Sequence, residues 1–185
     1  MPQHSYVVRK AAAEDIRGTL EMKLAAWRET YSDRRPESFF AAEEARREEL
    51  VAWWTNGLEA GAEFWIAVDT DGEIVGCAGG APVTEDDADT GAGLELQMLY
   101  VRSFAQGTGL GEQLMATVIG DEPALVWVLE GNGRAIRFYE KHGFVADGRV
   151  EALADEGGGL DWTGLNEMRM VRGAANRARA VRAAG

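Results

Sequence analysis

The sequence predicts a mixed α/β fold with about seven strands and about four helices. Apolar runs of strand length alternate along the chain with stretches in which apolar residues recur at helical spacing. Two of these runs flank Thr70-Asp71-Gly72, and an Asp-Gly pair between two strands is typical of a tight hairpin. With 185 residues and 46% hydrophobic composition, the chain can bury one substantial core. We therefore expect one domain over residues 1–172 and a mobile, Arg- and Ala-rich tail over residues 173–185.

The first half of the chain predicts one strand, two helices and a hairpin. Residues 5–9 read as a short strand, and a helix is expected from about Glu14 because apolar residues share one helical face. Arg34-Arg35-Pro36 should end this helix. A second helix is expected from about Ala41 and should end at Gly57 and Gly61. The apolar positions of the two helices are Ile16, Leu20, Leu24, Trp27 and Tyr31, then Leu50, Val51, Trp54 and Leu58.

The second half predicts strands and helices in alternation, closed by an antiparallel arm. One helix should start near Gly109 and end before Gly120 and Pro123, and the next should begin at an Asn132 N-cap and end at Gly143. Strands are expected over residues 63–69 and 73–82 for the hairpin, and over residues 96–101, 124–129, 144–150 and 166–171.

Charge and composition limit the partners. The formal net charge of −12 argues against attraction to nucleic acid or an anionic membrane. It would favour a cationic acceptor, although an acidic surface also serves solubility. No apolar run approaches the ~20 residues of a membrane span, so we expect a soluble, cytoplasmic protein. Cys77 is the only cysteine and reads as a buried small hydrophobe, and no zinc cluster is recognisable, so we expect no metal.

A glycine-rich turn follows the strand that ends at Val101. Its glycines leave backbone N–H groups unshielded at the start of a helix, which suits a phosphate. Gly111 is followed by Glu112-Gln113 rather than Lys-Ser or Lys-Thr, which excludes a Walker loop, and the glycine spacing fails the dinucleotide fingerprint. What remains is Gln106-x-x-Gly109-x-Gly111.

A second stretch, VWVLEGNGRAIRFYEKHGF over residues 126–144, contains Asn132, Phe138-Tyr139 and Gly143-Phe144. Together the two stretches resemble the GCN5-related N-acetyltransferase (GNAT) family. The resemblance implies a mostly antiparallel mixed sheet that splays after strand four, and acetyl-CoA as co-substrate. It further implies cofactor contacts from Leu99, Val101, Gln106, Gly107, Thr108, Gly109, Leu110, Gly111, Asn132, Arg134, Ala135 and Phe138.

Two residues are candidates for proton transfer. Tyr139 aligns with the frequent general acid of the family, and a phenol of pKa ~10 can protonate a thiolate whose thiol has a pKa of ~8.5. Glu95 aligns with the general base of the histone-acetylating branch, although a water relay could replace it. Arg134, Arg137 and Lys141 form a basic stripe that could meet the CoA phosphates or could simply be solvated.

The acceptor site is less defined. Trp27 and Tyr31 lie in the segment that helps form the acceptor pocket in the family, but aromatic residues at helical spacing are core residues more often than ligands. The stretch Trp27-Arg28-Glu29-Thr30-Tyr31 is faintly similar to polyamine acetyltransferases. The acidic residues 85–89 are expected to form a solvated loop.

The function predicted from the sequence is acetyl-CoA-dependent transfer of an acetyl group to a primary amine of a small molecule or peptide, by direct attack in a ternary complex. The alternative is a non-catalytic regulatory module that binds acetyl-CoA. A role in acylating aminoacyl-tRNA is disfavoured by the acidic charge. The resemblance also allows a homodimer.

Overall fold

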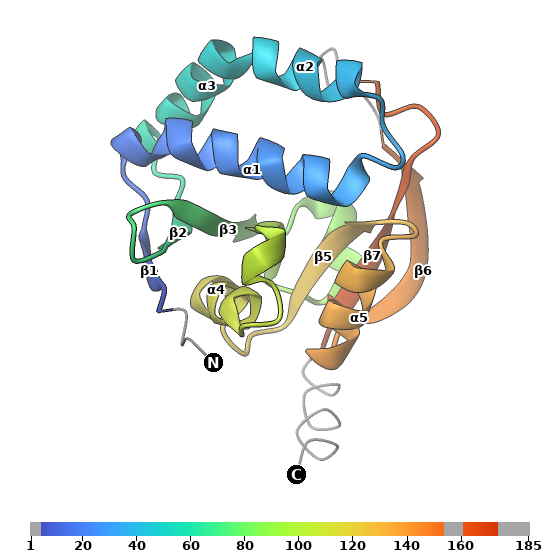
Figure 1. The fold of residues 1–185 in the computed structure, drawn as a ribbon. Coiled ribbons are helices and arrows are strands. Elements are labelled where there is room, and N and C mark those ends of the chain that lie inside the picture. The colour runs from blue at the N-terminus through green and yellow to red at the C-terminus, as the bar shows by residue number, and fades with distance from the viewer. Residues whose placement is uncertain (1–4, 154–160, 174–185) are drawn as a thin grey trace. The chain divides into compact units, whose positions relative to one another are not determined.

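The computed structural model describes residues 5–153 and 161–173. These residues form a seven-stranded, mostly antiparallel sheet in the order β1-β2-β3-β4-β5-β7-β6, together with five α-helices and three 3-10 helices (Figure 1). The elements in chain order are β1 (Val7–Lys10), η1 (Ala13–Asp15), α1 (Ile16–Tyr31), α2 (Glu37–Ala45), α3 (Arg47–Glu59), β2 (Phe64–Val68), β3 (Ile74–Pro82), η2 (Glu85–Thr90), β4 (Leu94–Val101), η3 (Ser103–Ala105), α4 (Leu110–Ile119), β5 (Ala124–Leu129), α5 (Gly133–Lys141), β6 (Val145–Ala152) and β7 (Asn166–Arg172). The mixed fold class predicted from the sequence is confirmed.

The chain divides into two compact units, each built from two segments. The first unit comprises Met1–Gly79 and Met98–Val118, and the second comprises Gly80–Gln97 and Ile119–Gly185. The strands β3 and β4 each begin in one unit and end in the other, so the chain passes between the units inside strands.

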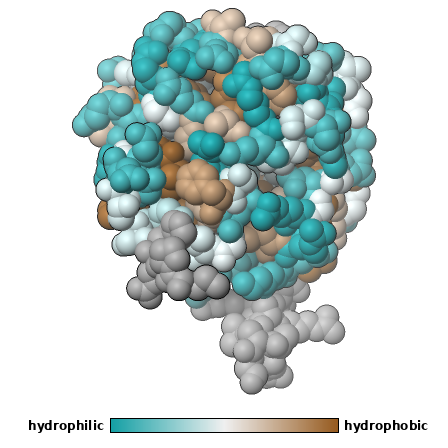
Figure 2. All heavy atoms as spheres, viewed as in Figure 1, coloured by the Kyte–Doolittle hydropathy of each residue, from teal (hydrophilic) through white to brown (hydrophobic). Residues whose placement is uncertain are grey.

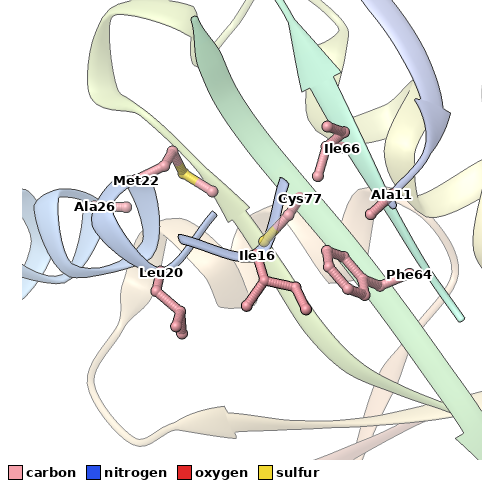
Figure 3. Close-up of a cluster of buried hydrophobic side chains, with 8 residues drawn as sticks. All are labelled: Ala11, Ile16, Leu20, Met22, Ala26, Phe64, Ile66 and Cys77. Atoms are coloured by element: carbon pink, nitrogen blue, oxygen red, sulfur yellow. The ribbon is translucent and has the colours of Figure 1, made fainter. Parts of the chain in front are cut away.

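The first unit places helices on both faces of its strands. The β2–β3 hairpin turns at residues 69–73, where the Asp69 N–H donates to the Glu73 carbonyl (3.0 Å) and Gly72 has a φ of +87°, as the Asp-Gly pair predicted. Phe64, Ile66 and Cys77 pack against α1 on one face of the hairpin, as Figure 3 shows. On the other face, Ala67, Val75 and Ala78 pack against α4 residues Leu110 and Leu114.

The region between β1 and β2 contains three α-helices, whereas the sequence predicted two helices. Pro36 was expected only to break the first helix, but it also serves as the N-cap of α2. Proline is tolerated at a helix start because it has no N–H group that would need an acceptor there. The next helix, α3, is separated from α2 by Arg46, which leaves the helical region at φ −88° and ψ 5°. The predicted number of about four helices was therefore too low.

The second unit is organised around antiparallel pairing of β7 with β5 on one side and with β6 on the other. Strand β4 pairs in parallel with β5 at Leu94–Ala124 and Glu95–Leu125 and then runs on to Val101. Such a short parallel pairing agrees with the splay expected after strand four. The strand β6 bulges between Ala146 and Val150, where Gly148 has a φ of +95°.

The predicted tail lies outside the described residues beyond residue 173. Among the helices that the structure describes, none is long and apolar enough to cross a membrane. The face of the molecule in Figure 2 is mainly hydrophilic, with hydrophobic residues in small separate areas.

Candidate active site

The glycine-rich turn of the first unit joins β4 to α4 through η3. Gly107 and Gly109 have φ values of +77° and +90°, which residues other than glycine rarely adopt. The Thr108 hydroxyl donates to the Ala105 carbonyl at 2.7 Å, and α4 begins with the Gln113 N–H donating to the Gly109 carbonyl at 3.0 Å. The sequence pattern therefore predicted the place of this turn.

The backbone N–H groups of residues 107–111 donate to no acceptor within the described part of the chain. Nothing lies within 4 Å of a Cβ built on Gly107 or Gly109, so an incoming group meets no side chain there. Consecutive unpaired N–H groups at the positive end of a helix are the backbone arrangement that binds phosphate. We call residues 106–111 the glycine turn.

Gln106 links the glycine turn to the end of β4. Its Nε2 donates to the Val101 carbonyl at 2.9 Å, while its Oε1 is buried and accepts no hydrogen bond from any described residue. An unmatched buried acceptor is costly unless a ligand supplies the donor. Leu99 and Val101 are partly buried against the α4 side of the sheet, so the structure gathers the predicted first-unit residues around one turn.

The sequence did not reveal that Glu29 of α1 holds the start of this turn. Its Oε2 accepts from the Ser103 N–H at 2.7 Å, and its Oε1 accepts from Arg102 Nε at 2.9 Å. Burial opposes ionisation, but these two donors outweigh it and hold the pKa of Glu29 below its usual range. Nothing in the sequence joins residues 29 and 103, which are 74 positions apart.

Trp27 and Tyr31 have different surroundings in α1. Trp27 is 8% exposed and stacks with Phe39, with ring centroids 6.2 Å apart. It also packs edge-to-face with Tyr100, with ring centroids 6.3 Å apart. Lys23 Nζ lies 4.2 Å from the centre of the Trp27 ring. Trp27 is thus a core residue of the first unit, and Tyr31 is partly exposed at the end of α1. Their role toward an acceptor stays a prediction.

In the second unit, α5 brings together the candidates from the second stretch. Asn132 caps the helix, with its side-chain oxygen accepting from the Ala135 N–H at 3.2 Å. Arg134 and Arg137 are exposed, and no hydrogen bond or ion pair joins either of them to another described residue. The Arg137 guanidinium lies over Gly133, since its Nη1 is 3.1 Å from a Cβ built there. This leaves two uncompensated cations at the start of α5.

Tyr139 lies on the opposite, buried side of α5 and is 6% exposed. Its ring packs between Phe138 and Phe144, with centroid distances of 5.3 and 5.5 Å. The helix ends at Lys141, and Gly143, whose φ is +85°, makes the predicted left-handed turn after it. The Phe144 N–H donates back to the Tyr139 carbonyl at 3.0 Å. These contacts fix the ring, which a positioned acid requires.

Glu95 lies on β4 in the second unit and is half-buried. Burial and the negative charge of Asp87 raise its pKa, while a hydrogen bond with Gln97 opposes them. A raised pKa brings a carboxylate closer to the proton affinity that a general base needs.

The acidic stretch before β4 differs from the prediction of a solvated loop. It forms η2, and Asp87 within it is only 6% exposed. Asp87 can be buried because it is paired with Arg169 of β7 and Arg149 of β6. The only sequence clue was Arg169 itself, which stands between Met168 and Met170 in the last predicted strand.

Cys77 is completely buried, and burial raises the pKa of its thiol to about 12. A thiol with that pKa stays protonated at neutral pH, and Cys77 is a buried small residue, as the sequence indicated. Within residues 5–153 and 161–173, no group of three or more His, Cys, Asp or Glu side chains could hold a metal ion.

Comparison with known proteins identifies one family. The sequence profile of the acetyltransferase (GNAT) family matches residues 24–144, which include Glu95, the glycine turn and α5. This match covers more than half of the chain.

Solved structures of similar fold agree with this match. PaiA N-acetyltransferase from Thermoplasma acidophilum, solved in complex with coenzyme A, is 18% identical with a TM-score of 0.62, over 91% of this chain and 99% of that chain. YjaB from Escherichia coli is 19% identical with a TM-score of 0.63, over 92% and 99%. A GCN5-related N-acetyltransferase from Rhodopseudomonas palustris is 18% identical with a TM-score of 0.64, over 94% and 98%.

Proposed function

The chain belongs to the acetyltransferase (GNAT) family, and we propose that it transfers the acetyl group of acetyl-CoA to a primary amine of a small molecule or peptide, by direct attack in a ternary complex. A polyamine-like acceptor agrees with the net charge of −12. The observation that carries the proposal is the run of unpaired N–H groups at residues 107–111.

The glycine turn fits the donor. Its N–H groups would bind the pyrophosphate, and the buried Gln106 Oε1 offers an acceptor for an N–H of the same ligand. The exposed cations Arg134 and Arg137 would serve the remaining phosphate charge of acetyl-CoA. One structural neighbour, PaiA N-acetyltransferase, was solved with coenzyme A, which supports this choice of donor.

The chemistry requires a base for the acceptor ammonium and an acid for the departing sulfur. Acetyl-CoA supplies the thioester carbonyl that the amine attacks. Glu95, with its raised pKa, would accept the proton of the amine, directly or through water. Tyr139 would give its phenolic proton to the sulfur, because the phenol and thiol pKa values lie within about 2 units of each other.

Acetyl transfer is tested by measuring thiol release from acetyl-CoA with a panel of polyamines, amino acids, aminoglycosides and peptides. We expect at least one amine to release thiol and acetyl-CoA to raise the melting temperature. A raised melting temperature with no turnover across the panel would favour the regulatory module instead. Absence of both effects would contradict the proposal altogether.

The role of the acid is tested with Tyr139→Phe, which removes one oxygen and keeps the ring between Phe138 and Phe144. We expect kcat to fall about 10²-fold or more with little change in the Kd of acetyl-CoA. Tyr6→Phe is the matched control, since it removes a phenolic oxygen from a residue that packs in the first unit against the core cluster containing Leu110 and Leu114 of α4. Equal kcat values for Tyr139→Phe and the wild type would remove Tyr139 from the mechanism.

A further inference from the structure

A buried arginine joins three elements of the second unit. The Arg169 side chain is 5% exposed, and it donates to Asp87 at 2.7 Å, to Asp89 at 2.9 and 3.0 Å, and to Asp147 at 2.7 Å. Arg149 adds a bond to Asp87 at 3.1 Å. We call Asp87, Asp89, Asp147, Arg149 and Arg169 the Arg169 cluster.

Asp87 is the buried carboxylate of this cluster and is held at both oxygens. Oδ1 accepts from Arg169 Nη1 and Arg149 Nη1, and Oδ2 accepts from Trp127 Nε1 at 3.2 Å. Asp89, by contrast, has a side chain that is 67% exposed, although it shares the same arginine. Asp87 therefore has a fixed position, with its charge shielded from water.

The strand register places Asp87 above the face from which Glu95 projects. Glu95 pairs with Leu125, and Trp127 lies two residues further along β5, so Glu95 and Trp127 point to the same face of the sheet. Trp127 in turn pairs with Arg169 across β5 and β7, which puts Arg169 on that face as well. Asp87 is bonded to both Trp127 and Arg169, and thus covers the surface beside Glu95.

We propose that Asp87 is a positioning residue for Glu95. The Arg169 cluster fixes the negative charge of Asp87 beside Glu95, the carboxylate that serves as general base. This inference rests on the proposed function, because it assigns Glu95 to proton transfer. The fixed charge disfavours a second charge nearby and so makes Glu95 a stronger proton acceptor.

The charges around Glu95 support this reading. The cluster contains three carboxylates and two guanidinium groups, so it keeps a net negative charge. Strand β5, the parallel neighbour of Glu95, carries no ionisable side chain. From η2, Asp87 raises the pKa of Glu95 in addition to burial, and on β4 itself Gln97 acts in the opposite direction. The positive groups on this face, Arg149 and Arg169, are already bonded to carboxylates.

The test is a direct titration of the Glu95 carboxyl by its ¹³C chemical shift, assigned with Glu95→Gln. In Asp87→Asn we expect the midpoint to move to lower pH, because the facing negative charge is gone. Asp89→Asn is the matched control: it removes the same charge from the same arginine at an exposed position, and its midpoint should equal that of the wild type. Equal midpoints in Asp87→Asn and the wild type would overturn the proposal.

Kinetics give a second measurement. The acid limb of the kcat/KM profile should move to lower pH in Asp87→Asn, with a smaller loss of kcat than the roughly 10²–10⁴-fold expected for Glu95→Gln. An acid limb that stays in place while the titration midpoint moves would also count against the proposal. If thermal unfolding shows that Asp87→Asn is not folded, Asp87→Ser is used, since it keeps an acceptor for Trp127 and must show the same shift. Because the titration needs no turnover, it separates failure of this inference from failure of acetyl transfer.

Discussion

The first unit presents its candidate binding groups from the backbone, whereas the second unit presents its candidate acid and base from side chains. In the glycine turn, conformation comes from Gly107 and Gly109, whose φ values suit glycine alone. In the second unit, the surroundings of Glu95 come from carboxylates held by a buried arginine. Backbone donors need only a short stretch of sequence, while charged side chains of controlled proton affinity need partners drawn from several strands.

The largest expected effect comes from removing the centre of the Arg169 cluster. Arg169→Met would leave Asp87 buried without its main partner, and we expect a loss of about 3–5 kcal/mol in the free energy of unfolding, measured by urea denaturation. Arg17→Met is the control, because Arg17 makes two hydrogen bonds with Glu48 at the surface, as Arg169 does with Asp89 inside the cluster. We expect no measurable loss for Arg17→Met. Similar losses of stability in the two variants would mean that the buried ion pairs of Arg169 contribute no more than the surface pair of Arg17.

The same contrast explains what could be predicted from the sequence. The hairpin at Asp71-Gly72, the glycine turn and the Asn132 cap each depend on neighbouring residues, and each was predicted at its observed place. The break between α2 and α3 was missed because Arg46 carries no helix-ending signal. The pairs Asp87–Arg169 and Glu29–Ser103 were missed because their members are 82 and 74 positions apart, and only the folded sheet brings them together.

A smaller effect is expected from strain in the glycine turn. In Gly109→Ala the new Cβ meets no atom within 4 Å, so the cost arises only from the φ of +90°. We expect a loss of about 1–2 kcal/mol in stability and weaker acetyl-CoA binding by calorimetry. Gly93→Ala is the control, because its Cβ also meets nothing within 4 Å and its φ is not in the left-handed region. Unchanged affinity for Gly109→Ala would show that the backbone conformation of the turn is not what binds the donor.

Glu29 is the exception in the first unit, since its side chain binds Arg102 and Ser103, which lead into the glycine turn. We expect Glu29→Gln to cost about 1 kcal/mol at pH 7, through loss of charge-assisted bonds to Ser103 and Arg102. The pKa of Glu29 is lowered in the folded state, so its contribution is present above the unfolded value of ~4.3 and is lost as the pH falls through the folded value. Urea denaturation at several pH values should show the two proteins converging below about pH 4; a constant difference would contradict the assignment.

The smallest stability effect, and the sharpest test of the first unit, is expected for Gln106→Met. This change removes the bond from Nε2 to the Val101 carbonyl, but it also removes the buried, unpaired Oε1. The two contributions oppose each other, so stability should change by less than about 1 kcal/mol. If Oε1 accepts an N–H of the donor, the Kd of acetyl-CoA should rise about fivefold, which corresponds to one hydrogen bond of about 1 kcal/mol. Thr117→Val, which removes an exposed hydroxyl bond on α4, should leave the Kd unchanged. An unchanged Kd in Gln106→Met would mean that the first unit binds acetyl-CoA through backbone groups alone. The first unit would then differ fully from the second, whose candidate acid and base are side chains.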